Sequence, residues 1–251
     1  MAKLIILGSA AAVPDQYHNN TYMLLQGVQD YILIDCAGSP LQVLLRLGVD
    51  LGRLEHLVVT HRHPDHIYGV PALILGLWLR GRARPLRVYG ERQSLATISA
   101  LLEIFRSDEW PLLFALTYYE VAMQTRQLVL DTAEFRILSS PVRHLVPTLA
   151  LRIEHKPSGR VWVYSSDTEP CQNVVDLARG ADVLIHEATG QQVGHSSSAQ
   201  AGEIAQQSGV KELILVHLPV MDVDMEDWRR QAVATFGGAV RLAQDFDVYE
   251  L

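Results

Sequence analysis

The sequence predicts an α/β fold. Short apolar runs bounded by turn residues recur from end to end, and segments with the apolar spacing of helices lie between them. The 251 residues are 49% hydrophobic and 20% charged, which suffices for a large hydrophobic core. Because no segment rich in Ser, Gly or Pro divides the chain, we expect one domain over residues 1–251.

The apolar runs predict strands in both halves of the chain. They lie at 3–7, 21–25, 31–35, 54–60 and 86–89, then at 134–138, 148–153, 161–165, 183–186 and 213–217. Helical spacing predicts helices at 40–47, 70–79, 94–105, 174–178, 198–208 and 225–236. Ser198 is a suitable N-cap and Gly209 a suitable stop for the helix between them. Several strands run directly into an ionisable residue, as expected where an α/β fold builds a site.

Charge and cysteine content exclude several classes of protein. The formal net charge of −7 argues against indiscriminate binding to nucleic-acid backbones. The two cysteines, Cys36 and Cys171, exclude a disulfide scaffold and favour a reducing compartment. The longest apolar stretches, 4–13 and 70–79, are too short to span a membrane. The first could serve as a signal peptide, but we interpret it as a strand and expect a cytoplasmic protein.

A cluster of metal-ligand side chains follows the predicted strand at 54–60. His61, His63, Asp65 and His66 lie within six residues, at a strand end where Pro64 disfavours continued regular structure. Imidazole and carboxylate together suit Zn²⁺, and also Mn²⁺ or Fe²⁺. A solvated polar loop is the alternative, but so many ligand-type residues at one strand end favour two adjacent ions.

Two ions need further ligands, and three later strand ends supply candidates. His144 follows the turn at Pro141, Asp167 lies just past the strand at 161–165, and His217 ends the strand at 213–217. Taken alone, each would be interpreted as a turn or cap residue. Together with the cluster at 61–66 they become candidate ligands.

The motifs resemble the metallo-β-lactamase-fold superfamily, whose signature is H-x-H-x-D-H, and most closely its tRNase Z branch. The matching segments cover almost the whole chain in order: 7–9, 13–14, 20–21, 33–36, 61–71, 86–90, 165–168 (S-S-D-T for S-G-D-T), 186–189 (H-E-A-T) and 194–197 (G-H-S-S for G-H-S-T). The resemblance implies an αβ/βα sandwich, in which two mixed β-sheets are flanked by helices.

The resemblance also implies roles for individual residues. His61, His63 and His144 would hold one divalent ion, Asp65, His66 and His217 the other, and Asp167 would bridge them. Asp35 would orient the ligands through hydrogen bonds. A hydroxide between the ions would be the nucleophile, with Asp65 holding it in line.

Taken alone, His195 could be a surface loop residue, but the resemblance implies that it is the general acid. A departing alkoxide needs a proton, and a histidine can supply one near pH 7. Glu187 would orient His195. His186 is interpreted as structural, and His18, His56 and His155 as surface residues.

The sequence departs from the tRNase Z pattern in ways that affect substrate choice rather than metal chemistry. No protruding tRNA-gripping arm fits between His144 and Asp167, and Ser166 replaces a glycine. Five arginines, all within residues 80–92, could contact a polyanion, although a solvated connection is the preferred interpretation.

We therefore expect a binuclear metal-dependent hydrolase, with two divalent ions (Zn²⁺ first, then Mn²⁺ or Fe²⁺). The preferred function is a phosphodiesterase that acts on a small molecule or an RNA 3′ end. The alternatives are an armless tRNA 3′-processing endoribonuclease, a thioester or lactone hydrolase, and a catalytically silent metal-binding module. The resemblance also leads us to expect a homodimer and no membrane partner.

Overall fold

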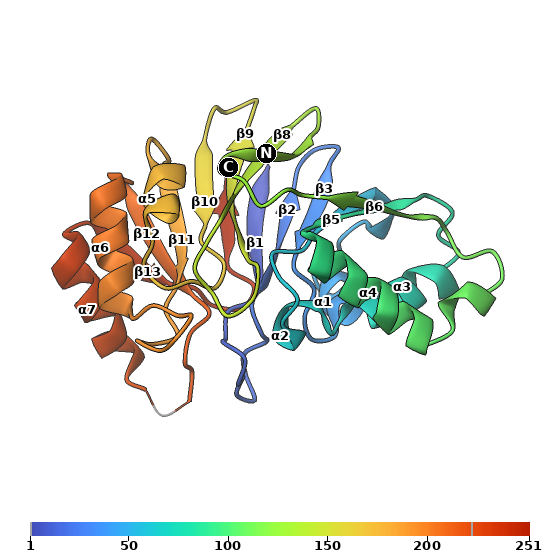
Figure 1. Ribbon diagram of the computed structural model, residues 1–251, viewed down its shortest axis with the longest axis horizontal. Coiled ribbons are helices and arrows are strands. Elements are labelled where there is room, and N and C mark those ends of the chain that lie inside the picture. The colour runs from blue at the N-terminus through green and yellow to red at the C-terminus, as the bar shows by residue number, and fades with distance from the viewer. Residues whose placement is uncertain (1, 222) are drawn as a thin grey trace.

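The computed structural model describes residues 2–221 and 223–251, which form two facing β-sheets with helices on both outer sides (Figure 1). Each sheet has seven strands, and each mixes antiparallel with parallel pairing. This is the predicted αβ/βα sandwich, so the predicted fold class is confirmed. No described helix has both the length and the apolar character needed to cross a membrane.

The first sheet has the order β14-β1-β2-β3-β4-β5-β6. Its antiparallel part comprises β14 (Val248–Glu250), β1 (Lys3–Gly8), β2 (Tyr22–Gln26) and β3 (Tyr31–Ile34). Its parallel part continues through β4 (Leu54–Val58), β5 (Leu86–Gly90) and β6 (Leu116–Glu120).

The second sheet repeats this plan in the order β13-β12-β11-β10-β9-β8-β7. Its antiparallel strands are β7 (Gln127–Asp131), β8 (Phe135–Pro141), β9 (Leu149–His155) and β10 (Val161–Tyr164). Its parallel strands β11 (Val183–Glu187), β12 (Glu212–Val216) and β13 (Ala239–Leu242) follow β10.

Alternation along the strands divides the apolar side chains between three buried layers. In β1, Leu4 and Ile6 pack between the two sheets, whereas Ile5 and Leu7 pack against the helices of the first half. Those helices are α1 (Pro40–Arg46), α2 (Pro64–Ile67), α3 (Val70–Leu79) and α4 (Arg92–Ile104). On the other outer face lie α5 (Gln172–Ala178), α6 (Ser198–Ser208) and α7 (Met225–Phe236).

Three details of the secondary structure differ from prediction. The N-cap of α6 is Ser197 rather than Ser198, since the Ser197 side chain accepts from the Gln200 N–H and Ser198 is the first residue of the helix. The strands β6, β7, β13 and β14 were not predicted, and the segment after His63 is not irregular but begins the short helix α2 at Pro64. Proline is compatible with the first position of a helix, because the N–H that it lacks would have no partner there. The turn of α2 brings Asp65 and His66 back toward the end of β4.

Candidate metal centre

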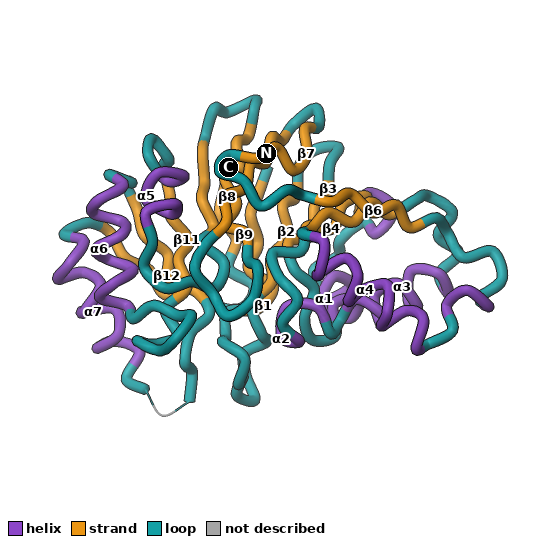
Figure 2. Tube along the Cα trace, in the orientation of Figure 1, coloured by secondary structure: helices purple, strands orange, loops and turns teal. Residues whose placement is uncertain are grey.

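The candidate ligands follow the carboxyl ends of strands in the two sheets, and they lie on loops and on the short helix α2. His61 follows β4, Asp167 follows β10 and His217 follows β12, and Figure 2 shows these loops gathered below the strands. Carboxyl ends of parallel strands meet at one edge of a sheet, which explains why residues far apart in sequence converge here. Asp35, Ser166 and His217 all have positive φ values, 58°, 52° and 55°. This conformation is uncommon outside glycine, and at Ser166 it explains why a glycine suits the motif.

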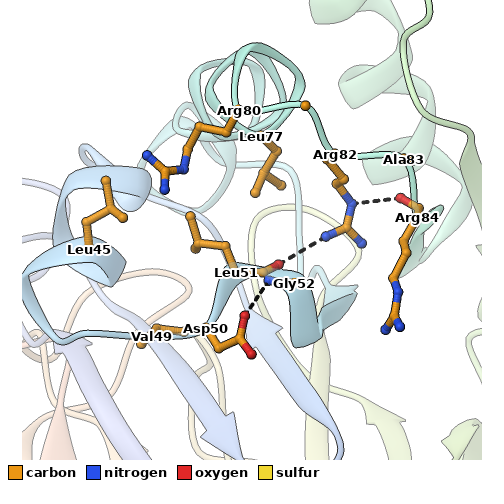
Figure 3. A pocket seen from close by; sticks show the side chains of 11 residues that line it. Leu45, Val49, Asp50, Leu51, Gly52, Leu77, Arg80, Arg82, Ala83 and Arg84 are labelled. Atoms are coloured by element: carbon orange, nitrogen blue, oxygen red, sulfur yellow. Dashed lines mark hydrogen bonds between the residues drawn. The ribbon is translucent and has the colours of Figure 1, made fainter.

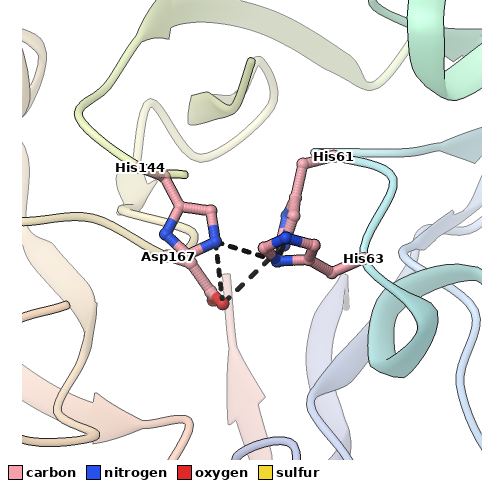
Figure 4. A group of neighbouring side chains, drawn as sticks. All are labelled: His61, His63, His144 and Asp167. Carbon is pink, nitrogen blue, oxygen red and sulfur yellow. Dashed lines mark hydrogen bonds and ion pairs between the residues drawn. The ribbon is translucent and has the colours of Figure 1, made fainter. Parts of the chain in front are cut away.

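The first group comprises His61, His63, His144 and Asp167, and their ligand atoms all lie within 4.8 Å of one another (Figure 4). His63 Nδ1 lies 3.2 Å from His61 Nε2 and 2.9 Å from His144 Nε2. Asp167 Oδ2 lies 3.7 Å from the same nitrogen of His61. Three ring nitrogens and one carboxylate therefore point at a common centre.

The second group comprises Asp65, His66, Asp167 and His217. Asp65 Oδ2 lies 3.6 Å from His66 Nε2 and 3.3 Å from His217 Nε2. Asp167 contributes to both groups, since its Oδ1 lies 3.4 Å from His66 Nε2 and its Oδ2 lies 3.5 Å from His217 Nε2. The structure thus brings all seven predicted ligands together and places Asp167 between the two groups.

Several candidate ligands have a hydrogen-bond acceptor at the outer ring nitrogen, the one that faces away from the ligand groups. These hydrogen bonds orient the inner ring nitrogen toward the centre of each group. Thr189 Oγ1 donates its single proton to the His217 carbonyl, so it accepts from His217 Nδ1, 2.6 Å away. His144 Nδ1 donates to the carbonyl of Gly194 at 2.7 Å. Both imidazoles therefore carry a proton at the outer Nδ1, which turns Nε2 toward the centre, as a metal ligand requires.

Asp35 fixes two further imidazoles in the same way. Its carboxylate accepts from His66 Nδ1 at 2.9 Å and from the hydroxyl of Thr60. Because that hydroxyl proton is donated to Asp35, Thr60 Oγ1 can only accept from His61 Nδ1, 3.1 Å away. Asp35 therefore orients His66 directly and His61 through Thr60, as expected of a residue that supports the ligands.

The electrostatics of the centre favour a cation. His66 Nε2 and Asp167 Oδ1 are buried and have no hydrogen-bond partner among the described residues. Burial by itself raises the pKa of the Asp167 carboxyl, but the surrounding histidines hold it well below its usual range. Burial lowers the pKa of His66, and the carboxylates of Asp167 and Asp35 outweigh it and raise that pKa well above the ordinary value. Two sets of converging imidazole and carboxylate groups thus fit divalent ions.

His195 and Glu187 form a pair beside the ligands. His195 Nδ1 lies 3.0 Å from Glu187 Oε1, and the His195 ring stacks on His217 with ring centres 5.7 Å apart. Burial lowers the pKa of His195, but the Glu187 carboxylate raises it overall above the ordinary value. The buried Glu187 carboxylate also accepts from the backbone N–H groups of Thr168 and Ser196. The predicted pairing of these two side chains is therefore present.

The remaining histidines are of two kinds. His18 is partly exposed and contacts Asp15, whereas His186 is buried with its Nδ1 2.7 Å from the Glu187 carbonyl. The prediction that His56 and His155 lie at the surface is wrong, because both are buried, at 8% and 6% exposure. Both lie in strands at positions that turn inward, where Tyr89 and Ser158 supply polar contacts.

Arg80, Arg82 and Arg84 precede β5 and lie away from this centre, whereas Arg92 follows β5 at the same ends of the parallel strands as His61. Arg82, which lines a pocket of about 490 Å³, donates to the carbonyls of Leu51 and Arg84 (Figure 3). Leu51 precedes β4, at the end of that strand opposite His61. The structure supports the interpretation of this segment as a solvated connection, because its ionic contacts are local. Glu55 pairs with Arg84 and Arg87, and Glu120 pairs with Arg92.

Comparison with known proteins identifies the family. A profile described as the beta-lactamase superfamily domain matches residues 30–218. The chain belongs to this superfamily. Within it, similarity to ribonuclease Z proteins extends over nearly the whole sequence: the chain is 29% identical to that of Methanothermobacter thermautotrophicus, covering 87% of each protein. It is 28% identical to that of Mycobacterium marinum, covering 100% of this chain and 99% of the relative.

Solved structures of the beta-lactamase superfamily share the fold. The metallo-beta-lactamase fold protein YhfI from Bacillus subtilis superposes with a TM-score of 0.81 at 25% identity, over 99% of this chain and 98% of the other. The short form of human tRNase Z gives 0.80 at 23% identity, again over 99% and 98%. The predicted resemblance is confirmed, and this member of the superfamily is a metal-dependent hydrolase. The described residues between β9 and β10 are only 156–160, so the tRNA-gripping arm expected of the tRNase Z pattern does not protrude between these strands.

Proposed function

We propose that this chain is a binuclear phosphodiesterase of the tRNase Z-like type. The observation that carries the proposal is the shared position of Asp167 between two convergent ligand groups, with the His195–Glu187 pair alongside. His61, His63 and His144 would hold one ion, and Asp65, His66 and His217 the other, with Asp167 bridging. Zn²⁺ is the expected metal, and Mn²⁺ or Fe²⁺ suit the same donors.

Divalent ions bound there would supply an acidified water and neutralise charge on the phosphoryl oxygens. The chain's own residues perform the rest of the reaction. Asp65 orients the attacking water, whose oxygen bonds to phosphorus as the bond to the leaving oxygen breaks. His195 transfers a proton to that leaving oxygen from Nε2, because its Nδ1 faces Glu187. Glu187 is a positioning residue that also stabilises the imidazolium.

Relatives named ribonuclease Z favour a second candidate, cleavage near the 3′ end of an RNA precursor. For this activity the substrate would have to dock without an arm between β9 and β10. We also propose that residues 1–251 act as one domain and that the protein is a cytoplasmic homodimer. Sedimentation of the metal-loaded protein tests the dimer.

The decisive experiment is hydrolysis of bis(p-nitrophenyl) phosphate by Zn²⁺- or Mn²⁺-loaded protein. We expect turnover in the wild type, a loss of at least about 10³-fold in Asp65→Ala, and no change in Asp108→Ala, which removes an exposed carboxylate of the same type. Metal content is measured for each variant.

Absence of turnover with both ions bound would contradict the proposal. Hydrolysis of a thioester or lactone under the same conditions would then identify the alternative chemistry, and inertness toward all three ester classes would indicate a binding module.

A further inference from the structure

A recess of about 340 Å³ opens above the candidate ligands. Its polar wall consists of His63, Asp65, Asp167, His195 and His217, together with Thr189 and Gln192. Among the described residues, none that lines it is Lys or Arg. Arg143, which adjoins the ligand His144 in sequence, pairs with Glu169 instead at 3.0 Å. None of the described lining residues of the recess therefore carries a permanent positive charge.

Large apolar side chains lie exposed around the mouth of this recess. We call them the apolar rim: Val13, Leu145, Val193 and Met221, with 67%, 63%, 74% and 50% of their surface exposed. Val13 and Met221 line the recess itself. Leu145 adjoins the ligand His144 in sequence and Val193 adjoins the lining residue Gln192, and a Cβ added at Gly194 would lie 3.1 Å from Leu145 Cγ.

The rim residues come from four separate loops, so no single amphipathic helix or strand explains their exposure. Exposed apolar side chains gathered at the mouth of a polar site are typical of a ligand-binding surface.

A second phosphate on a substrate would find no permanently cationic side chain among the described residues of the recess. The carboxylates at or directly behind the ligands are those of Asp35, Asp65, Asp167 and Glu187. Divalent ions held by the ligands would offset these charges and receive the reacting phosphate. A second phosphate would instead face apolar side chains such as Val13 and Met221, because none of the described lining residues is Lys or Arg.

We infer that the recess selects phosphodiesters whose only charge is at the reacting phosphate and whose other substituent is uncharged and aromatic or apolar, packed on the apolar rim. This inference rests on the proposed phosphodiesterase function and names its substrate class. A nucleoside esterified without further phosphates fits this class. An oligonucleotide, which carries a second phosphate next to the reacting one, fits it poorly.

The test compares three p-nitrophenyl phosphodiesters that share one leaving group. Their other substituents are methyl, thymidine joined through its 5′ oxygen, and the same thymidine carrying a 3′-phosphate. We expect kcat/KM to rise about tenfold from methyl to thymidine, because the base packs on the apolar rim, and to fall again about tenfold with the added phosphate. Both changes should appear mainly in KM, because the chemical step is the same.

Variants of the apolar rim separate recognition from catalysis. Val13→Ser and Met221→Ser should each remove most of the advantage of thymidine over methyl, measured as the ratio of the two kcat/KM values within the same variant. Val13→Lys should restore part of the activity on the phosphorylated thymidine ester. The matched control is Val28→Ser, because Val28 is 61% exposed but lies in the β2–β3 turn, at the other edge of the sheet.

A binding measurement gives an independent readout. Anilinonaphthalene sulfonate carries one anionic group on an aromatic body and is not hydrolysed. Its fluorescence should rise on binding, the substrates should displace it, and Val13→Ser or Met221→Ser should weaken its binding about tenfold whereas Val28→Ser should not.

Hydrolysis of all three diesters with equal kcat/KM would overturn the inference and leave the proposed function intact. Hydrolysis of none of them, with the metals bound, would instead contradict the proposed function. If, in addition, Val13→Ser and Met221→Ser bind anilinonaphthalene sulfonate as well as the wild type does, the inference is overturned too.

Discussion

At the scale of single residues, the candidate centre depends on which ring nitrogen of each histidine carries a proton. Thr189, Gly194, Thr60 and Asp35 accept hydrogen bonds from outer ring nitrogens, which turns the inner ring nitrogens toward the centre. An imidazole without such a partner rotates and changes tautomer more freely. These acceptors therefore determine how well the ligand set is preorganised for a metal.

Thr189→Val should weaken metal binding although Thr189 is not itself a candidate ligand. The substitution removes the acceptor for His217 Nδ1 while keeping the size of the side chain. We expect affinity for Zn²⁺ to fall about 10- to 100-fold, measured by competition with a chromogenic chelator. Thr189→Ser retains the hydroxyl and should stay close to wild type. Equal affinities for the Val and Ser variants would contradict this role.

His195→Ala should affect substrates according to their leaving groups. A p-nitrophenolate leaves without a proton, whereas an alkoxide needs one. We expect kcat for an alkyl leaving group to fall about 10²- to 10⁴-fold, and much less for p-nitrophenol. The measurement is the slope of log kcat against leaving-group pKa, which should steepen in the variant. A uniform decrease across the series would rule out His195 as the acid.

The sequence predicts the ligand candidates because each ends or closely follows an apolar strand, a pattern visible without coordinates. Their hydrogen-bond partners are not predictable in this way. Thr189 contacts His217, and the Gly194 carbonyl contacts His144, because the fold brings separate loops together. Sequence spacing does not reveal these contacts. The arginines at 80–92 show the converse, because four of the five make local hydrogen bonds or ion pairs, namely Arg82, Arg84, Arg87 and Arg92.

At the scale of elements, prediction fails where strands are short or lie at sheet edges. β14 has three residues, and β6 and β7 are the ends of their sheets. Four of the five residues of β6 are exposed, so its side chains show little apolar alternation. Such strands form because a neighbouring strand offers unpaired backbone groups, and this cause lies outside their own sequence.

Glu134 joins elements of the two sheets. Its carboxylate accepts from the backbone N–H groups of Val28, Gln29 and Asp30 in the β2–β3 turn, at distances of 2.7–3.0 Å. Burial raises the pKa of Glu134, but these three bonds lower it overall below the ordinary value. The ionised form is therefore the one that stabilises the folded protein, and the stabilisation is complete above the unfolded-state pKa of about 4.3.

Glu134→Gln should consequently destabilise the protein in a pH-dependent way. At pH 7 we expect the free energy of unfolding to fall by about 1–2 kcal/mol, measured with urea. As the pH falls through the lowered pKa of Glu134, the wild type loses this stabilisation and the difference between the proteins should shrink. The exposed Glu203→Gln is the control and should change little at either pH. A difference independent of pH would contradict the assignment to the carboxylate.

At the scale of the whole molecule, the centre lies between two halves that are built alike. The first half contributes His61, His63, Asp65 and His66, and the second contributes His144, Asp167 and His217. The two ends of the chain are also tied together, because Asp245 accepts from the backbone N–H groups of Ser9 and Asn19 at the start of the chain. Convergence of this kind depends on the packing of one sheet against the other.

Metal removal should therefore lower the stability of the molecule as a whole. An ion that binds only the folded state stabilises it by about 4 kcal/mol when present at 1,000 times its Kd, which corresponds to roughly 10 °C in Tm for a chain of this size. Calorimetry of metal-loaded and chelator-treated protein should show one cooperative transition that shifts by this amount. Asp65→Asn and His144→Asn, one from each half, should each reduce the shift, whereas Asp108→Asn should not. A Tm that chelation leaves unchanged, or a shift confined to one of two separate transitions, would show that the ions do not link the two halves.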